Sequence, residues 1–410
     1  MSFLKKILLS PSLLVIADQA ISSGTNFLLT LLLAQKLDIK NFGLFSTIVL
    51  VTYLAMSITN ALIIQPFQVS ISKISKKKEY YVALFFGLVA LLSIFIVIVK
   101  LLVLLLPNYN AYSHQSNAII CFVFGYLLQD FFRKIFLAIA NIVMVVIIDI
   151  MFLILISIAF YILNNEITLF SSLLIWGLAN IVSSIPGFYF IVINYETPIS
   201  WKSFLQDHTT QGKWLFSVAI LQWCSSNFFV LISGIYLGVE ALGALRLVQS
   251  FFGVINIVLQ SVENYFLPKV AFLSTKNIDE AKKYLLEITA YGALIFAIIL
   301  SVLSVFSTEM IVLAGGYKYE SYDYVVRIIA VLYFFIFLSY PFRIAVRILG
   351  LNNIFFIGYL ISFVVSILIF HFLLKYFSLY GAVWGLIINQ IMMILYWQNQ
   401  LKKKQFRLWK

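Results

Sequence analysis

The sequence predicts an all-α polytopic membrane protein of about twelve transmembrane helices, arranged as two six-helix lobes that are related by a parallel internal repeat. Three observations support this fold class. Of the 410 residues, 63% are hydrophobic and only 11% are charged, and the mean hydropathy of +1.03 is far above that of an ordinary soluble domain. Apolar stretches of about 20 residues, the length that crosses a bilayer, recur along the whole chain. Short sequence patterns of the first half return in the second half.

The expected spans divide evenly between the two halves, which we place at residues 1–200 for the N-terminal lobe and 201–410 for the C-terminal lobe. The connections are short, the longest being expected at 194–213 and 265–287, so no catalytic domain fits outside the membrane. By hydropathy the spans lie at about 12–35, 42–64, 80–106, 117–132, 142–163 and 169–193, then at 214–237, 241–263, 288–311, 324–342, 354–374 and 380–400.

Basic residues predict the orientation of these spans. Most of the 28 lysines and arginines fall in alternate connections or the tail, including the clusters Lys76 to Lys78 and Lys402 to Lys404. By the positive-inside rule both termini therefore lie in the cytoplasm. The clusters are expected to touch membrane lipids and not nucleic acid. The outer connections contain only Lys36, Lys40, Lys318 and Lys375.

The internal repeat is visible as three pairs of similar segments. Each half holds an even number of spans, so both halves start on the same side and the repeat is parallel. Duplicated bundles of this kind place their binding site between the halves. The first pair is Ser22, Ser23, Asn26 and Phe27 with Ser225, Ser226, Asn227 and Phe228; the others are Leu37 and Gly43 with Leu237 and Gly243, and Pro66 with Pro268.

One face of the eighth expected span is polar along its length. At about 100° per residue its six polar or glycine positions share an arc of roughly 100°, and the run is about 25 Å long. Polar groups that face lipid are strongly disfavoured, so this face looks onto protein or water. The pattern predicts that the chain encloses a transmembrane path. The six positions are Arg246, Gln249, Gly253, Asn256, Gln260 and Glu263.

Two carboxylates lie within expected spans and are candidates for ion or proton coupling. Asp18 lies in the first span, and Asp149 lies deeper, in the fifth. A carboxylate inside a membrane helix suggests a protonation switch or a cation ligand, although Asp18 also has the alternative of pairing with a basic group. Asp130 and Arg133 are three residues apart, a spacing that predicts a local salt bridge at a helix end.

Several classes of chemistry find no support. The two cysteines, Cys121 and Cys224, both lie in apolar runs, so they are expected to pack in the core and to form neither a disulfide framework nor a metal site. No phosphate-binding loop of the ATPase type occurs. We expect no catalytic residues, no cofactor and no metal, and a protein that is not an enzyme.

A set of short motifs in both halves of the chain carries a resemblance to a known family. They are Gln222-Trp223-Cys224-Ser225-Ser226-Asn227-Phe228-Phe229, Leu242-Gly243-Ala244-Leu245-Arg246, Gln249, Glu263-Asn264-Tyr265 and Pro268, with Asp18-Gln19 through Asn26-Phe27 to Phe42-Gly43, Gln129 to Lys134, and Asp149. With these motifs the chain resembles the bacterial polysaccharide transporters, the oligosaccharide-lipid flippases of the multidrug, oligosaccharidyl-lipid and polysaccharide exporter superfamily. The resemblance covers nearly the whole chain in topology, but its motifs are diffuse.

The resemblance implies a flippase that moves a polyprenyl-pyrophosphate-linked oligosaccharide across the bacterial inner membrane by alternating access. The product would serve surface or exopolysaccharide synthesis, such as that of lipopolysaccharide O-antigen, with a polysaccharide polymerase and chain-length machinery as possible partners. One departure is that Arg246 is the only clear basic candidate well inside a span, whereas some relatives line the cavity with several. The expected substrate path comprises Arg246, Gln249, Asn256, Gln260, Glu263, Asn26, Asn227 and Gln222.

Each of these residues also has a structural interpretation. Arg246 either binds the pyrophosphate or extends to the membrane interface. The amides of the eighth span either bind sugar hydroxyls or hydrogen-bond to neighbouring helices. Glu263 either gates the path or caps or pairs with a basic loop residue, and Asn26 and Asn227 either line the cavity or lock a helix pair.

Two other functions compete with the flippase. A cation-coupled small-molecule or multidrug antiporter on the same scaffold is the alternative; it favours an acidic and aromatic cavity, whereas the polar face here is near neutral. An integral-membrane glycosyltransferase or polymerase needs a large outer loop with carboxylates or arginines, and the outer loops are too short.

Overall fold

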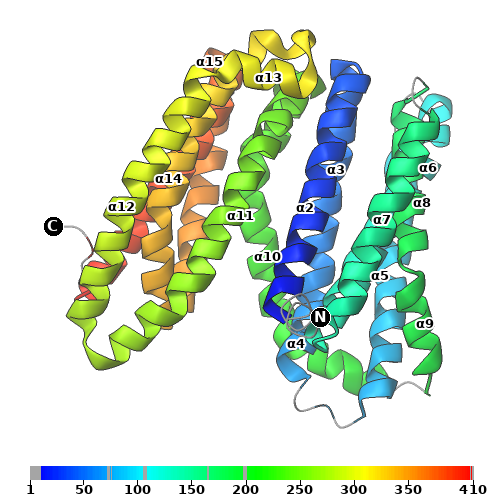
Figure 1. Cartoon of the computed structure of the whole chain (residues 1–410), viewed down its shortest axis with the longest axis horizontal. Helices are drawn as coiled ribbons and strands as arrows, with labels where there is room; N and C mark the ends of the chain where they lie inside the picture. Colours follow the sequence, from blue (N-terminus) through cyan, green and yellow to red (C-terminus); the bar gives the residue numbers. More distant parts are fainter. Residues whose placement is uncertain are drawn as a thin grey trace, which may run out of the picture. The chain divides into compact units, whose positions relative to one another are not determined.

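The computed structural model describes residues 11–71, 74, 76–104, 109–163, 166–196, 201–406 and 408. Within these residues every regular element is a helix, which confirms the predicted all-α fold class (Figure 1). The elements are α2 (Pro11–Lys36), α3 (Ile39–Thr59), the π-helical turn η1 (Asn60–Ile64), α4 (Gln65–Ser70), α5 (Lys77–Leu104), α6 (Tyr109–Ala138), α7 (Ile142–Leu163), α8 (Leu169–Ser183), α9 (Ile185–Ile193), α10 (Trp201–Leu237), α11 (Val239–Lys276), α12 (Ile278–Val305), α13 (Ser307–Gly315), the 3-10 helix η2 (Tyr317–Tyr322), α14 (Asp323–Ile348) and α15 (Asn352–Lys403).

Every expected span overlaps one or more of these helices. Nine helical stretches of the described residues are long and apolar enough to cross a membrane; α2 and α6 are not among them, and α15 counts once. α15 holds 52 residues, about 78 Å at 1.5 Å per residue, which is enough for two crossings. Its non-helical residue Ser378 (φ 49°, ψ −130°) separates the last two expected spans.

The two longest of the expected loops, 194–213 and 265–287, are largely helical in the described residues, so the prediction of loops there was wrong. α10 begins at Trp201 and α11 continues to Lys276, with Pro268 inside the helix. Asn277 alone separates α11 from α12, and its side chain accepts a hydrogen bond from the backbone N–H of Asp279 at 2.9 Å. Hydropathy marks only where a helix leaves the hydrocarbon, and charged residues are compatible with a helix that continues into water.

A π-helical turn interrupts the second helical span before Pro66. The Nδ1 of His208 lies 2.8 Å from the carbonyl oxygen of Leu62 in this turn, and its Nε2 lies 2.7 Å from the hydroxyl of Tyr80. A carbonyl only accepts, so Nδ1 donates, and in the neutral ring Nε2 accepts from Tyr80. The ring also stacks on Phe204 at 4.1 Å. These contacts anchor the start of α10 to η1 and α5.

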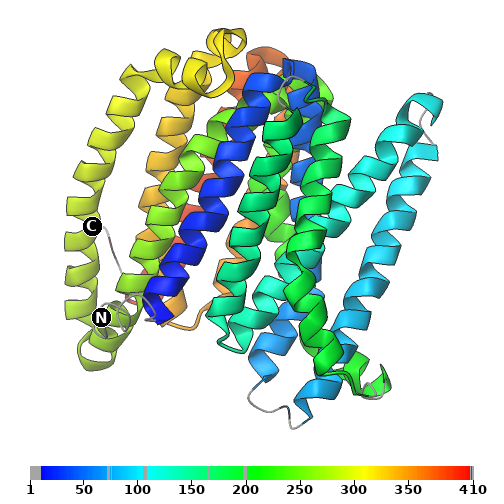
Figure 2. The same cartoon turned by 45° about the vertical axis from the view of Figure 1, so that its right-hand side comes forward.

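The described residues form two compact units. Unit 1 contains the residues up to Leu29 and residues 48–220, and unit 2 contains residues 30–47 and 221–410. Within unit 1, α6 packs against α5, α7 and α8 (Figure 1). Within unit 2, α14 packs against α11, α12 and α15 (Figure 2). The two six-helix lobes predicted at residues 1–200 and 201–410 stay a prediction.

Residues 30–47, the end of α2 and the start of α3, pack within unit 2 through a close backbone contact. A Cβ added at Gly43 would lie 2.1 Å from the carbonyl oxygen of Val239, and one added at Gly243 would lie 2.9 Å from the Cα of Gly43. Lys318 donates to the carbonyl oxygens of Gln35 and Leu37, which belong to the last turn of α2 and the residue after it. Glycine is therefore required where α3 and α11 meet.

Asp38, between α2 and α3, caps the N-terminus of α3. The backbone N–H of Asn41 donates to Oδ1 of Asp38 at 2.7 Å, and the Asn41 amide donates to Oδ2 at 2.7 Å. These hydrogen bonds, the backbone one first, lower the pKa of the Asp38 carboxyl. The cap satisfies backbone donors at the start of α3, which otherwise have no partner within the helix.

Candidate functional site

The polar residues of the eighth expected span all lie on the continuous helix α11, as the periodicity requires. A Cβ added at Gly253, in the middle of this face, would meet no atom of the described residues within 4 Å, so the face is open there. Exposure then varies along it: Arg246, Gln249 and Asn256 are half-buried, and Gln260 is exposed. The polar face is thus open at Gly253, within the described residues.

Two members of this face are hydrogen-bonded within unit 2. Nη1 of Arg246 donates to Oε1 of Gln249 at 3.2 Å, and Nδ2 of Asn256 donates to the hydroxyl of Tyr333 on α14 at 2.8 Å. Asn256 therefore joins two helices, as the structural interpretation expects, while its amide oxygen is an additional acceptor. Arg246 and Gln249 thus form a hydrogen-bonded pair, and Gln249 lies about one helical turn before Gly253.

Glu263, at the end of the polar face, is paired with two arginines of α14. Its Oε1 lies 2.6 Å from Nη1 of Arg347, and its Oε2 lies 3.6 Å from Nη2 of Arg343. The carboxylate side chain is only 5% exposed. Pairing was one of the expected alternatives for Glu263, but the expected partner was a loop residue. Both arginines lie instead within the last turns of a helix.

The other residues of the expected path are divided between the units. Asn26 is half-buried on α2 in unit 1, whereas Gln222 and Asn227 lie on α10 in unit 2. Gln222 is exposed, and Nδ2 of Asn227 donates to the carbonyl oxygen of Trp223 on its own helix at 3.0 Å. No single unit brings the two repeat-related asparagines together.

Asp18 and Asp149, from α2 and α7, meet at a single arginine. Nη2 of Arg133 on α6 lies 3.1 Å from Oδ1 of Asp18, and its Nε lies 2.8 Å from Oδ1 of Asp149. The two carboxylate side chains are 5% and 3% exposed. Oδ2 of Asp149 is buried without a hydrogen-bond partner among the described residues. With both carboxylates ionised, this cluster carries one negative charge in excess.

The predicted salt bridge between Asp130 and Arg133 is wrong. Asp130 instead accepts a hydrogen bond from Nζ of Lys134 at 2.8 Å. Lys134 lies four residues after Asp130 on the same helix and directly follows Arg133. Both the i, i+3 and i, i+4 spacings allow contact on a helix, so spacing cannot select between the two partners. The buried carboxylates of α2 and α7 decide the choice, because they need a cation and Arg133 reaches both of them.

The sequence analysis paired Arg133 with Asp130 and singled out neither Arg343 nor Arg347, so it missed the buried partners of all three. One signal was present: Arg343 and Arg347 are spaced i, i+4 and so share one helix face. No such signal exists for Arg133, because its partners lie 115 residues away at Asp18 and on another helix at Asp149.

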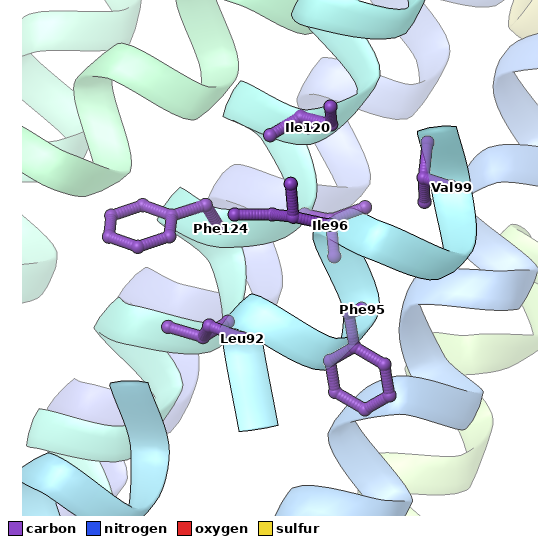
Figure 3. Close-up of a pocket in the computed structure, with 7 residues that line it drawn as sticks. Leu92, Phe95, Ile96, Val99, Ile120 and Phe124 are labelled. Atoms are coloured by element: carbon purple, nitrogen blue, oxygen red, sulfur yellow. The ribbon is translucent and has the colours of Figure 1, made fainter. Parts of the chain in front are cut away.

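Two pockets, one in each unit, have a mostly apolar lining. Figure 3 shows one between α5 and α6, with a volume of about 10 Å³, enough for about one water molecule. A second, of about 200 Å³, lies between α14 and α15. Neither has a charged side chain in its lining, so neither suits a phosphate headgroup. The first is lined by Leu92, Phe95, Ile96, Val99, Ile120, Val123 and Phe124, and the second by Phe335, Leu338, Phe342, Ile391, Ile394, Leu395 and Gln398.

A metal centre finds no basis in the part of the chain that the structure describes. No group of three or more histidines, cysteines, aspartates or glutamates comes together there in a way that could hold a metal ion. The polar face of α11 and the two arginine clusters consist of amides, arginines and carboxylates paired with arginines. These groups bind hydroxyls, anions and protons.

Comparison with known proteins connects this architecture to transporters. No family model matches the chain, and no curated protein matches it in sequence. Among solved structures, lipid II flippase MurJ in an inward closed conformation is similar with a TM-score of 0.74 and 14% identity, over 96% of this chain and 89% of that chain. An inward-facing multidrug resistance MATE family transporter of the MOP superfamily is similar with a TM-score of 0.67 and 13% identity, over 97% of this chain and 96% of that chain. A MOP superfamily transporter from Pyrococcus furiosus is similar with a TM-score of 0.57 and 12% identity, over 96% of this chain and 91% of that chain.

These likenesses define the class of fold. The chain has the multi-pass helical fold of these solved transporters of the MOP superfamily, and nine stretches of its described residues are long and apolar enough to cross a membrane. The fold therefore agrees with the one that the resemblance in the sequence motifs implies. Flippases and multidrug transporters share this fold, so the fold alone does not select between their substrates.

Proposed function

We propose that the chain is a secondary transporter that flips a polyprenyl-pyrophosphate-linked oligosaccharide across the bacterial inner membrane for surface or exopolysaccharide synthesis. The observation that carries this proposal is the polar face of α11. It combines one arginine, a donor for pyrophosphate, with the amides Gln249, Asn256 and Gln260, which suit sugar hydroxyls. The likeness to MurJ, whose name records a lipid II substrate, agrees with this choice.

The proposed transport cycle needs no catalytic residue and no cofactor. The two lobes rock about a central site in alternating access, with both termini in the cytoplasm. The polar face then meets water from one side of the membrane at a time. A polysaccharide polymerase and chain-length machinery would consume the product on the outer side. Membrane lipids surround the chain and receive the lipid tail of the substrate.

A cation-coupled multidrug antiporter is the second candidate function, and the cluster of Asp18, Arg133 and Asp149 favours it. Two buried carboxylates share one arginine, so the cluster has room for a proton or another monovalent cation. The same site serves the flippase as a coupling site, because an ion that binds one conformation better biases the transport cycle. The cluster of Asp18, Arg133 and Asp149 would therefore bind the coupling ion, whereas the polar face of α11 would bind the substrate.

Deletion of the gene in its host distinguishes the two functions. Loss of the flippase is expected to leave lipid-linked oligosaccharide on the cytoplasmic side of the membrane and to reduce surface glycan, measured by lipid extraction and glycan staining. Restoration by the plasmid-borne gene is the control. Normal surface glycan together with a changed tolerance to cationic drugs would instead support the antiporter.

Arg246→Ala is expected to reduce surface glycan in the complemented deletion strain by about tenfold or more, the size of one lost charge-assisted hydrogen bond. Arg246→Lys should retain part of the activity, because it keeps the charge and loses the bidentate geometry. Arg327→Ala on α14, where Arg327 pairs with Asp323 on its own helix, is the matched control and should have little effect. Full glycan in both Arg246 variants at normal protein levels would exclude Arg246 as the headgroup ligand.

A further inference from the structure

Arg343 and Arg347 of unit 2 share one carboxylate between them. They lie one turn apart on α14, and Glu263 on α11 is the acidic residue that pairs with both. The carboxylate is 5% exposed, while the side chains of Arg343 and Arg347 are 21% and 43% exposed. The cluster thus carries one positive charge in excess. Arg347 is its most exposed member, so a ligand would approach from the side of Arg347.

The cluster has more hydrogen-bond donors than acceptors. Each guanidinium offers five N–H groups, whereas the carboxylate accepts at two oxygens. Oε1 is engaged by Arg347 at 2.6 Å, and Oε2 lies 3.6 Å from Arg343, which is long for a hydrogen bond. Nε of Arg343 is buried without a hydrogen-bond partner among the described residues. A buried donor without an acceptor is costly, so Arg343 is left with unmet capacity.

Aromatic rings hold both guanidinium groups in place. Arg343 lies over the ring of Tyr340 at 4.8 Å, and Arg347 lies over the ring of Phe355 at 5.8 Å. Cation–π contacts of this kind orient a planar guanidinium. The Tyr340 side chain also hydrogen-bonds to Arg343, whereas the Phe355 ring supplies Arg347 with no oxygen acceptor. The N–H donors of the arginines are therefore oriented in advance, but not all of them have an acceptor. A multivalent oxyanion would supply the missing acceptors. A phosphate group offers several acceptor oxygens and matches the arginine fork.

We propose that Arg343 and Arg347 bind the pyrophosphate of the lipid-linked substrate when it is loaded, before Arg246 binds it further along the polar face, and that Glu263 occupies the arginine pair until the pyrophosphate displaces it. The source of the pyrophosphate rests on the proposed function. Glu263 lies one turn beyond the exposed Gln260, so the pair extends the polar face of α11. In the proposed orientation this end of α14 is cytoplasmic, the side on which the substrate is loaded.

The proposal and a purely structural ion pair differ in the sign of one effect. If the cluster only holds α11 to α14, then Glu263→Gln and Arg343→Gln both weaken the same contact and act in the same direction. If Glu263 competes with a phosphate, removing its charge strengthens phosphate binding, whereas removing an arginine weakens it. Opposite effects on binding from the two ends of one ion pair identify the anion site.

The test measures binding of farnesyl pyrophosphate to the full chain in phosphatidylcholine nanodiscs. We expect Arg343→Gln and Arg347→Gln to raise the Kd by about tenfold or more, and Glu263→Gln to lower it severalfold. Arg343→Lys, which retains the charge and loses the fork, should give an intermediate loss and also serves if Arg343→Gln does not fold. Arg327→Gln, on the same helix and outside the cluster, is the matched control and should bind like the wild-type chain. Farnesol, which lacks the phosphates, should not bind at this site.

The opposing outcomes are equally distinct. An unchanged Kd in the arginine variants, or a higher Kd in Glu263→Gln, would overturn the anion site. Repeating the titration with phosphatidylglycerol in the nanodiscs separates the source: if only phosphatidylglycerol binding responds to the variants, the pair is a site for bulk anionic lipid and the proposal is wrong. Failure of the site and failure of the proposed function remain separate, because deletion of the gene reports on transport without reference to these arginines.

Discussion

Arg133→Gln is expected to lower the free energy of unfolding by about 3–5 kcal/mol, the largest effect of any single charge removal in unit 1. Arg133 is the cation that pairs with both Asp18 and Asp149, and those carboxylates are almost fully buried. Without the guanidinium, either two charges remain buried side by side or one carboxyl takes up a proton, and each outcome costs free energy. Thermal unfolding of the purified chain in detergent measures the effect.

Lys134→Gln is the matched control for this prediction. Lys134 is the next residue of α6 and pairs with Asp130 on its own helix, with 27% of its side chain exposed. Pairs of this kind contribute about 0.3–0.5 kcal/mol, so the control should unfold nearly like the wild-type chain. Comparable destabilisation by the two variants would mean that Arg133 is not holding the carboxylates in the way described.

Neutralising the whole cluster should restore most of the stability that Arg133→Gln removes. In the triple variant Arg133→Gln, Asp18→Asn, Asp149→Asn no buried charge is left without a partner, and replacement of a complete buried ion pair is often close to neutral. The triple variant also separates structure from coupling. If the cluster binds the coupling ion, the variant folds but its transport no longer responds to the proton or sodium gradient.

Gly43→Ala is expected to destabilise unit 2 by about 3 kcal/mol or more, because it overpacks a contact between two backbones. The added methyl group would meet the carbonyl oxygen of Val239 at 2.1 Å, and a backbone atom cannot move aside as a side chain can. Relief requires α3 and α11 to separate, which would also disturb the facing contact of Gly243. The yield of folded protein and its unfolding temperature in detergent are the measurements.

Gly253→Ala on α11 is the same glycine-to-alanine change, but we expect it not to destabilise the protein. A Cβ there meets no described atom within 4 Å, and alanine is favoured over glycine in a helix by about 0.5–1 kcal/mol. This variant should therefore unfold at the same or a slightly higher temperature. A stable Gly43→Ala variant alongside an unstable Gly253→Ala variant would contradict the packing described for α11.

The polar face of α11 illustrates what periodicity can predict. Spacing alone places Arg246, Gln249, Asn256, Gln260 and Glu263 on one side of a helix, and α11 is continuous across all of them. Periodicity carries no information about the partner of each residue. The hydroxyl of Tyr333 that accepts from Asn256 lies 77 residues further along the chain.

Hydropathy and spacing, read from the chain alone, determined the all-α class, the course of the expected spans and the polar face of α11, because transfer of apolar side chains from water and the helical repeat act locally. The tertiary structure decided how charges combine: Arg133 between Asp18 and Asp149, and Glu263 between Arg343 and Arg347. A buried charge selects its partner by proximity in space, and helices distant in sequence bring that partner near.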